Sequence, residues 1–390
     1  MHSSSQLSFL TENEYFGNKS IQNVRKIINL LNVSKALVVT GKDSYITSGA
    51  EHYLKKELIN CDCIFVNDFE VNPKYEDMSR IGRTLKDSSF DIIIAIGGGS
   101  VIDFAKCLNV YICTINNTGM DGITDKSLLD TSYLPMIAIP TTAGTGSEAT
   151  HFAVAYIMGR KVSIAHQGLK PSYVILDPRF TYNLPKYITA CSCFDALCQA
   201  IESFWSIGAT AESQKFASEA IQIIKINAFQ AINGQSPLAR NNLLLGAFLA
   251  GKAINISKTT APHALSYPLT SHFGIPHGHA VAMTLGIFFD LNEAPDISLN
   301  SSASLTLKEH KNRMLHLRSL LEFNEESSVQ EQWKKFLSEC GLNDKPSSNF
   351  SGLVPDDLLC NINIERLSNH PVKHTNDILE NIYKNLLEIN

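Results

Sequence analysis

A carboxylate and a side-chain amide stand four residues apart in the stretch C-F-D-A-L-C-Q-A-I-E, as Asp195 and Gln199. In a helix, side chains at this spacing project from the same face. Two histidines, His263 and His277, follow further along the chain. A carboxylate, an amide oxygen and two imidazoles form a thiol-free donor set that suits Zn²⁺ or Fe²⁺. We therefore predict a divalent metal site formed by these four side chains, with one position open for a substrate.

The two histidines of this set flank the stretch 264–276, so we expect one at a helix end and the other in the following loop. His279 lies just beyond the second of them, and His151 lies in the first half of the chain. A single histidine is more often a hydrogen-bonded structural residue than a ligand or a catalyst. Both are nevertheless further candidates for a catalytic or substrate-binding role.

Two loops rich in small residues each follow an expected strand. The first, G-G-G-S-V-I-D-F-A-K at 97–106, has consecutive glycines whose backbone N–H groups can approach a pyrophosphate at the start of a helix. The second, P-T-T-A-G-T-G-S-E at 140–148, adds hydroxyls that can bind phosphate, ribose or a nicotinamide amide. Neither is the dinucleotide fingerprint G-x-G-x-x-G, and either alone is compatible with a tight turn that binds nothing. Together they indicate a nucleotide site.

The first half of the chain alternates short β-branched runs with helical stretches. Several of the runs are almost continuously apolar, which is typical of parallel strands covered on both faces. This rhythm predicts a doubly wound α/β sheet. The expected strands are 36–40, 63–66, 91–96, 136–139 and 173–176.

Beyond Leu184-Pro185 the strand-like runs disappear and long helical patterns follow, so we expect two domains that meet near residue 185. The expected helices of the second domain are 195–206, 211–233, 239–256, 280–291, 308–321, 328–340 and 375–388.

Composition excludes several other classes of protein. Apolar residues make up 44% and charged residues 18% of the 390 residues, and the net charge is -5. Nucleic acid and anionic membranes are therefore not expected partners. No apolar run reaches the roughly 20 residues of a membrane span, and the amino terminus lacks the pattern of a secretory signal, so we expect a cytoplasmic protein.

These motifs, in this order, resemble those of the iron-containing (group III) alcohol dehydrogenase family. The matching stretches are 97–106, 140–148, D-P at 177–178, L-P at 184–185, D-A-L-x-x-A-I-E at 195–202, H-A-L at 263–265 and P-H-G at 276–278. The resemblance implies a Rossmann-like dinucleotide-binding α/β domain over residues 1–185 and an all-helical metal-binding catalytic domain over residues 186–390. It also implies a reaction between the two domains, NAD or NADP with Fe²⁺ or Zn²⁺ as cofactors, and a homodimer or larger homo-oligomer.

The resemblance makes Asp195, His263 and His277 metal ligands. The positions that it implies for the cofactor are Gly41, Asn72, Gly97, Gly98, Gly99, Ser100, Asp103, Thr141, Thr142, Thr145 and Lys161.

The chain departs from the family pattern at three positions. Gln199 stands where the family usually has a second-ligand histidine, and Tyr267 stands where a histidine often follows four residues after His263. A phenol can donate a proton, so Tyr267 is a candidate acid. Gly41, followed by Lys42, replaces an aspartate that would exclude the 2′-phosphate, which leaves both NAD and NADP open.

Within the family, the stretches 147–155, 195–206 and 253–267 resemble phosphonoacetaldehyde reductases, which reduce 2-phosphonoacetaldehyde to 2-hydroxyethylphosphonate in phosphonate biosynthesis. A dianionic phosphonate requires cations and hydroxyl donors, which Lys258 and Thr259 are placed to supply. Lys258 is equally compatible with a purely structural role at a helix end. The expected reaction is hydride transfer from NAD(P)H to a metal-bound small aldehyde, with the proton supplied by Tyr267, His279 or water.

Three other functions remain open. A general short-chain alcohol or lactaldehyde dehydrogenase would use the same residues. A sugar-phosphate cyclase, which regenerates its NAD, shares a motif that resembles H-G-x-A-V-A at 277–282. A catalytically inactive binding protein would explain Gln199, because an amide oxygen is a weaker ligand than imidazole.

Overall fold

The computed structural model describes residues 8–86, 88–346 and 358–388. The chain divides into two compact units, Met1–Leu184 and Pro185–Asn390.

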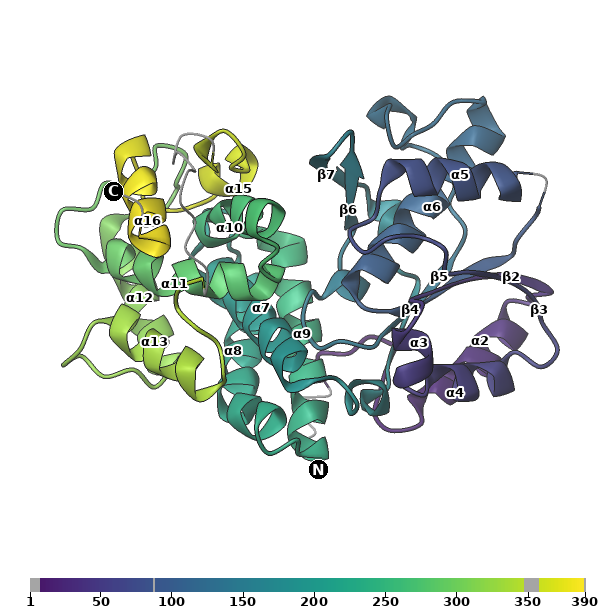
Figure 1. Cartoon of the computed structure of the whole chain (residues 1–390), viewed down its shortest axis with the longest axis horizontal. Coiled ribbons are helices and arrows are strands. Elements are labelled where there is room, and N and C mark those ends of the chain that lie inside the picture. The colour runs from purple at the N-terminus through teal and green to yellow at the C-terminus, as the bar shows by residue number, and fades with distance from the viewer. Residues whose placement is uncertain (1–7, 87, 347–357, 389–390) are drawn as a thin grey trace. The chain divides into compact units, whose positions relative to one another are not determined.

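Six strands of the first unit form one sheet (Figure 1). Every neighbouring pair is parallel, and the order across the sheet is β1-β8-β5-β4-β2-β3. The five strands expected from the sequence are all present, each to within one residue at either end. The strands are β1 (Glu14–Phe16), β2 (Lys35–Thr40), β3 (Asp62–Val66), β4 (Ile92–Gly97), β5 (Met136–Pro140) and β8 (Tyr173–Leu176).

Helices cover both faces of this sheet, as Figure 1 shows. Successive side chains of β2 alternate between the two faces: Leu37 and Val39 pack into one buried apolar cluster, and Ala36 and Val38 into the other. The continuous apolar runs therefore arise because both faces of each central strand are buried. The covering helices are α5 (Tyr75–Leu85) and α6 (Gly99–Thr118) on one face and α2 (Asn23–Leu30) and α4 (Ala50–Glu57) on the other.

Three strands were not predicted. β1 has only three residues, all half-buried, so it lacks an apolar run. β6 (Phe152–Ile157) and β7 (Arg160–Ala165) form an antiparallel hairpin outside the sheet. Its turn places Met158 and Gly159 at φ of 50° and 74°, and methionine is not one of the residues that normally signals such a turn.

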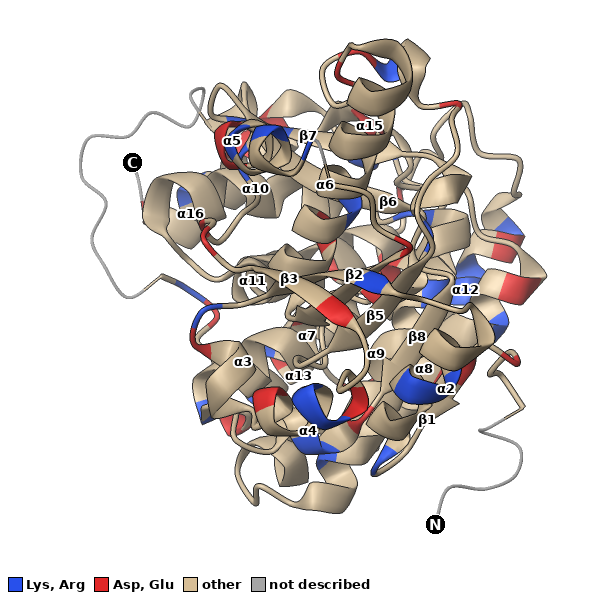
Figure 2. Ribbon diagram, turned by 90° about the vertical axis from the view of Figure 1, so that its right-hand side faces the viewer, with Lys and Arg blue, Asp and Glu red and all other residues tan. Residues whose placement is uncertain are grey.

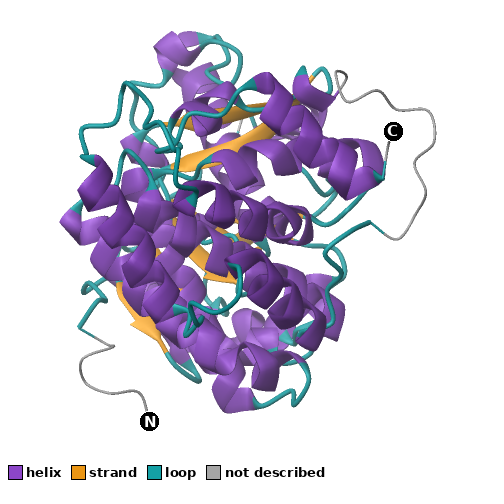
Figure 3. Cartoon of the chain, turned by 90° about the vertical axis from the view of Figure 1, so that its left-hand side faces the viewer, coloured by secondary structure: helices purple, strands orange, loops and turns teal. Residues whose placement is uncertain are grey.

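The second unit is built from helices, which Figure 3 shows in purple. They are α7 (Lys186–Trp205), α8 (Ala211–Ile232), α9 (Pro237–Ser257), α10 (Ala261–Phe273), α11 (His277–Glu293), α12 (Leu307–Leu320), α13 (Val329–Glu339), α15 (Ile364–Ser368) and α16 (Asn376–Leu387). The predicted fold class, a parallel α/β domain followed by an all-helical domain, is confirmed.

Helix α10 was not predicted as a whole, because two prolines interrupt its pattern. Pro262 lies in the first turn, where its missing N–H leaves no helical bond unmade, and Pro268 lies inside the helix. His263 is therefore at a helix end, as expected. His277 is the first residue of α11, so the expectation that it lies in a loop was wrong.

Among the described residues, no helix is both long and apolar enough to span a bilayer. Acidic and basic residues lie side by side on α4 (Figure 2), where Lys55 pairs with Glu51 at 2.6 Å.

Candidate functional site

Three helices of the second unit bring the predicted metal ligands together. Asp195 lies on α7, His263 in the first turn of α10, and His277 at the start of α11. One ligand atom from each of the three lies within 4.8 Å of the others. Asp195 and His263 are buried, and His277 is half-buried. Gln199 follows Asp195 one turn later on α7 and is also buried.

The distances within this group fit a divalent cation. Nε2 of His263 lies 3.4 Å from Oδ1 of Asp195, and the rings of His263 and His277 are 5.3 Å apart. Two ligand atoms that each lie about 2.0–2.2 Å from one tetrahedral metal are separated by roughly 3.4 Å. The carboxylate and the imidazole are therefore spaced as two ligands of one cation.

The position after His277 requires a glycine, because α11 begins very close to α7 there. A Cβ at this position would lie 2.0 Å from the carbonyl oxygen of Cys191 and 2.7 Å from Cβ of Asp195. The absence of a side chain lets α11 begin directly against α7, which places His277 beside Asp195.

A second carboxylate, Glu202, contacts the other side of the His263 ring. Its Oε1 forms a short contact with Nδ1 of His263, and its Oε2 accepts hydrogen bonds from Thr260. Burial opposes a charge on His263, but Glu202 and Asp195 outweigh it and raise the pKa of His263 to about 9 when no cation lies between them. Glu202 was not predicted as a site residue, although it lies seven residues after Asp195 and so on the same helix face.

Tyr267 and His279, the two predicted proton donors, differ in their surroundings. The ring of Tyr267 lies 5.8 Å from that of His277. His279 is engaged at both nitrogens, with Nε2 at 2.7 Å from the carbonyl oxygen of Asn343 and Nδ1 at 3.0 Å from the hydroxyl of Tyr187. Because a carbonyl oxygen can only accept, the single proton of a neutral His279 points at Asn343. Burial lowers the pKa of His279, which favours this neutral form.

In the first unit, the two small-residue loops lie beside each other at the carboxyl end of the sheet. Gly97 ends β4 and pairs in register with Pro140 at the end of β5. The backbone N–H of Thr141 donates to the carbonyl oxygen of Gly97 at 2.9 Å. A Cβ on Gly99 would lie 2.5 Å from Oγ1 of Thr145, so a glycine is required where the loops approach each other.

The order in which successive strands are added across the sheet reverses between the parallel strands β2 and β4, because β3 lies on one side of this pair and β5 and β8 lie on the other. In doubly wound sheets, ligands bind outside the carboxyl ends of the strands at this switch point. Gly41 follows β2, and Gly98 and Gly99 begin the twenty-residue helix α6 after β4. The glycines thus lie where such a fold binds a nucleotide, at a helix amino end that suits a phosphate.

Two further predicted cofactor residues are close to each other. Asn72 has a left-handed backbone with φ of 64°, and its N–H donates to Oγ of Ser100 at 3.4 Å. Asp103, in contrast, is half-buried, and its carboxylate accepts from the hydroxyl of Ser147 and the N–H of Val154. Its contacts therefore hold the second loop and the hairpin against α6.

The remaining predicted cofactor and substrate residues are Lys161, Lys258, Thr259 and His151. Lys161 lies on β7, opposite Tyr156 of β6. Lys258, which follows the last residue of α9, forms an ion pair with Glu365. The neighbouring Thr259 is buried, and its carbonyl oxygen accepts from Asn369 at 3.0 Å. His151 is half-buried just before β6, and its carbonyl oxygen accepts from the N–H of His166.

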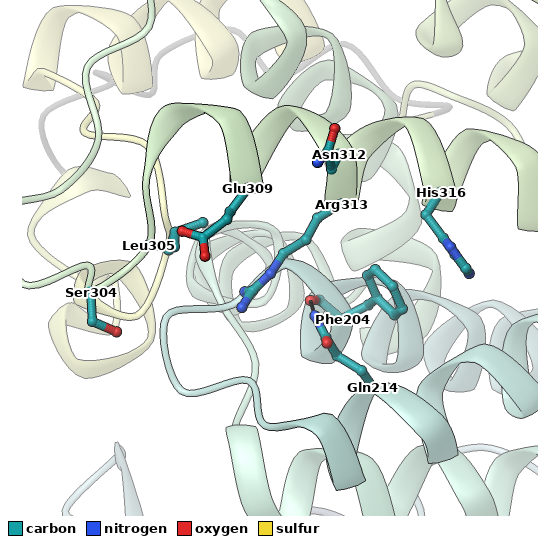
Figure 4. A pocket seen from close by; sticks show the side chains of 8 residues that line it. All are labelled: Phe204, Gln214, Ser304, Leu305, Glu309, Asn312, Arg313 and His316. Atoms are coloured by element: carbon teal, nitrogen blue, oxygen red, sulfur yellow. Dashed lines mark hydrogen bonds between the residues drawn. The ribbon is translucent and has the colours of Figure 1, made fainter.

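A separate pocket lies on the helical unit and contains no predicted site residue. Figure 4 shows Arg313 reaching from α12 into it, and Phe204 stacks on His316 with ring centroids 5.3 Å apart. Nη1 of Arg313 donates to the carbonyl oxygen of Ser206 at 3.1 Å.

Comparison with known proteins identifies the family that shares this architecture. Residues 12–178 match the family described as iron-containing alcohol dehydrogenase, and residues 189–342 match its C-terminal part. The chain belongs to the iron-containing alcohol dehydrogenase family.

Individual relatives are named for different activities. Long-chain-alcohol dehydrogenase 1 of Geobacillus thermodenitrificans is 34% identical over 221 residues, or 56% of each chain, so the match spans about half the length of that relative. Phosphonoacetaldehyde reductase of Streptomyces viridochromogenes is 30% identical over 289 residues, or 72% of each chain. The crystal structure of sulfoacetaldehyde reductase from Bifidobacterium kashiwanohense in complex with NAD+ superimposes with a TM-score of 0.82, at 27% identity and 97% coverage of each chain.

Proposed function

We propose that this protein is a metal-dependent, NAD(P)H-linked reductase of a small aldehyde, with 2-phosphonoacetaldehyde as substrate and 2-hydroxyethylphosphonate as product. The observation that carries the proposal is the convergence of Asp195, His263 and His277 from three helices on one point. Similarity to the Streptomyces reductase over 72% of each chain supports the choice of substrate.

In this proposal the two domains have separate tasks. Residues 1–185 bind the dinucleotide, with the N–H groups that follow Gly98 and Gly99 directed at its pyrophosphate. Residues 186–390 hold the metal through Asp195, His263 and His277, and the amide oxygen of Gln199 completes the ligand set. The remaining predicted cofactor residues, among them Asn72 and Lys161, contact the ribose and nicotinamide parts.

The protein contributes binding, orientation and a proton. When bound, the divalent cation supplies Lewis-acid polarisation of the substrate carbonyl, and the reduced nicotinamide supplies the hydride. Tyr267 donates its phenolic proton to the oxygen that becomes the alcohol. His279 holds its proton on Asn343, so it orients the start of α11 rather than acting as the acid. Burial of Asp195, Gln199 and His263 keeps bulk water from the ligands.

A general alcohol or aldehyde dehydrogenase is the second candidate. The ion pair between Lys258 and Glu365 favours this candidate. A lysine that is already paired with a carboxylate binds a phosphonate less strongly than an unpaired lysine does. Similarity to the Geobacillus alcohol dehydrogenase supports the same alternative.

A substrate panel separates these candidates. Metal-reconstituted protein is assayed by nicotinamide absorbance with phosphonoacetaldehyde, sulfoacetaldehyde, lactaldehyde and propanal, each with NADH and with NADPH. The proposal predicts the highest kcat/KM for phosphonoacetaldehyde. Equal or better turnover of propanal would select the general dehydrogenase. Stoichiometric metal without any net cofactor oxidation would contradict a reductase and favour a cyclase or an inactive binding protein.

A further inference from the structure

A buried chain of polar contacts leads from a tryptophan to the metal-site histidine. It consists of Trp205 and Glu202 on α7, and Thr260 and His263 at the start of α10. Trp205, Glu202 and Thr260 are fully buried, and His263 is 4% exposed. None of the first three was predicted as a functional residue.

Glu202 has partners on both carboxylate oxygens. Oε2 accepts from the N–H of Thr260 at 2.6 Å and from its hydroxyl at 2.8 Å, and Oε1 contacts Nδ1 of His263. A buried carboxylate is costly unless such donors compensate it. All three donors come from the first turn of α10 or its cap, so Glu202 fixes that end of the helix on α7.

The direction of each hydrogen bond in the chain follows from the chemistry of the groups. The indole Nε1 of Trp205 can only donate, and it lies 2.9 Å from Oγ1 of Thr260. The Thr260 hydroxyl therefore accepts from Trp205 and gives its single proton to Glu202. Since a carboxylate can only accept, Nδ1 of His263 carries a proton, so Nε2 is the nitrogen left to face a cation.

Nε2 faces the place where the metal is expected, because it lies 3.4 Å from Oδ1 of Asp195. Partners of this kind behind a ligating histidine fix its tautomer and ring orientation and raise its basicity. The requirement is greater here because the fourth ligand of the proposed set is the amide oxygen of Gln199.

We propose that Glu202 is a positioning residue for the metal site, which holds His263 with Nε2 toward the cation and is itself held by Thr260 and Trp205. The inference rests on the metal site of the proposed function. It predicts that metal affinity depends on residues that touch neither metal nor substrate.

Metal affinity provides the test. Purified apo variants are titrated with Co²⁺ and with Zn²⁺ in competition with a chelator, and the Co²⁺ absorption bands report the ligand geometry. Glu202→Gln should weaken binding about 10- to 100-fold and shift the Co²⁺ bands. Trp205→Phe keeps the ring and removes the donor, so it should produce a smaller loss in the same direction. Thr260→Val should resemble Glu202→Gln, whereas Thr260→Ser, which keeps the hydroxyl, should bind as the wild type does.

Asp290→Asn is the matched control. The carboxylate of Asp290, on α11, also accepts two backbone hydrogen bonds, from Val329 and Gln330, but contacts no predicted ligand. The metal affinity of Asp290→Asn should equal that of the wild type. If Glu202→Gln does not fold, as judged by circular dichroism and Tm, the pair Thr260→Val and Thr260→Ser decides the question.

Failure of this inference is distinguishable from failure of the metal site itself. If Asp195→Asn loses the metal while Glu202→Gln and Thr260→Val keep wild-type affinity and spectra, Glu202 has no positioning role and the inference is overturned. If Asp195→Asn and His277→Ala bind metal as the wild type does, the metal site of the proposed function is wrong as well.

Discussion

The ring of Tyr267 lies 5.8 Å from the ring of His277, with the two planes tilted by 36°. Tyr267 is also one helical turn after His263 on α10, so the phenol and both metal-site imidazoles gather at one place. This relationship makes the phenol a neighbour of the proposed metal rather than a residue of the helix exterior.

Replacing Tyr267 with phenylalanine should therefore affect the chemical step. We expect Tyr267→Phe to lower kcat by about 100-fold or more, because general acids contribute about 10²–10⁴ to rates, while KM changes little. Steady-state kinetics with the preferred aldehyde, combined with metal analysis, measures this effect. Tyr267→His introduces the residue that the family resemblance implies at this position and should retain more activity than Tyr267→Phe. Wild-type kcat in Tyr267→Phe would assign the proton to water.

Gln199, which we propose as the fourth metal ligand, leads to a second prediction. Gln199 is buried one turn after Asp195, and imidazole is a stronger ligand than an amide oxygen for zinc-class metals. Gln199→His should therefore tighten Zn²⁺ binding by roughly tenfold or more. Gln199→Ala should weaken it, provided that the amide ligates the metal. Chelator competition on both variants measures the change in Zn²⁺ affinity. If Gln199→Ala binds Zn²⁺ as tightly as the wild type, the amide does not bind the cation.

Local sequence patterns sufficed for the parallel sheet and the long helices. The β-branched runs at 36–40 and 91–96 are easy to recognise in the sequence, because both faces of those strands are buried. The pairing of Asp195 with His263 and His277 was predictable from residue type and from the family resemblance. The helix spacing that indicated Gln199 also applies to Glu202, so the sequence alone could have indicated this residue.

Other features depend on contacts between distant segments, which no local pattern encodes. Lys258 meets Glu365, and Trp205 meets Thr260, only after the helices have packed. The start of α11 at His277 depends on the close approach that Gly278 permits. Such contacts decide which of several plausible polar residues face the candidate metal site.

The loop that contains Thr141, Thr142 and Thr145 is held by a buried lysine. Nζ of Lys106 donates to the carbonyl oxygens of Ser147, Thr150 and Phe152 at 2.7, 2.7 and 2.9 Å. Lys106→Met would leave these carbonyl groups without their donor, so we expect a loss of about 3–5 kcal/mol in the free energy of unfolding. We also expect weaker NAD(H) binding by the folded variant.

Lys126→Met is the matched control for this prediction. Nζ of Lys126 donates to only one carbonyl oxygen, that of Ser163, at the exposed surface. Its loss should cost less than about 1 kcal/mol and leave cofactor affinity unchanged. Chemical denaturation and cofactor fluorescence titration compare the two variants, and similar stabilities would show that the buried lysine does not hold the loop.

Stability in acid should depend on two neighbouring histidines, the buried His370 and the half-buried His374. His370 and His374 have ring centroids 5.0 Å apart and pack on Phe288. Burial lowers the pKa of His370 well below its usual value, with the neighbouring His374 and His310 acting in the same direction. Burial also lowers the pKa of His374 to about 4.

Because the unfolded chain protonates these imidazoles near pH 6.5, it binds more protons than the folded state between that value and about pH 4. Their contribution to stability is therefore complete above pH 6.5 and is lost progressively as the pH falls. We expect the free energy of unfolding of the metal-loaded protein to fall by about 1 kcal/mol per histidine for each pH unit in this range. The double variant His370→Phe/His374→Gln should show a flatter dependence when denaturation is measured between pH 7 and pH 5. An equally steep fall in the double variant would place the acid-sensitive groups elsewhere in the protein.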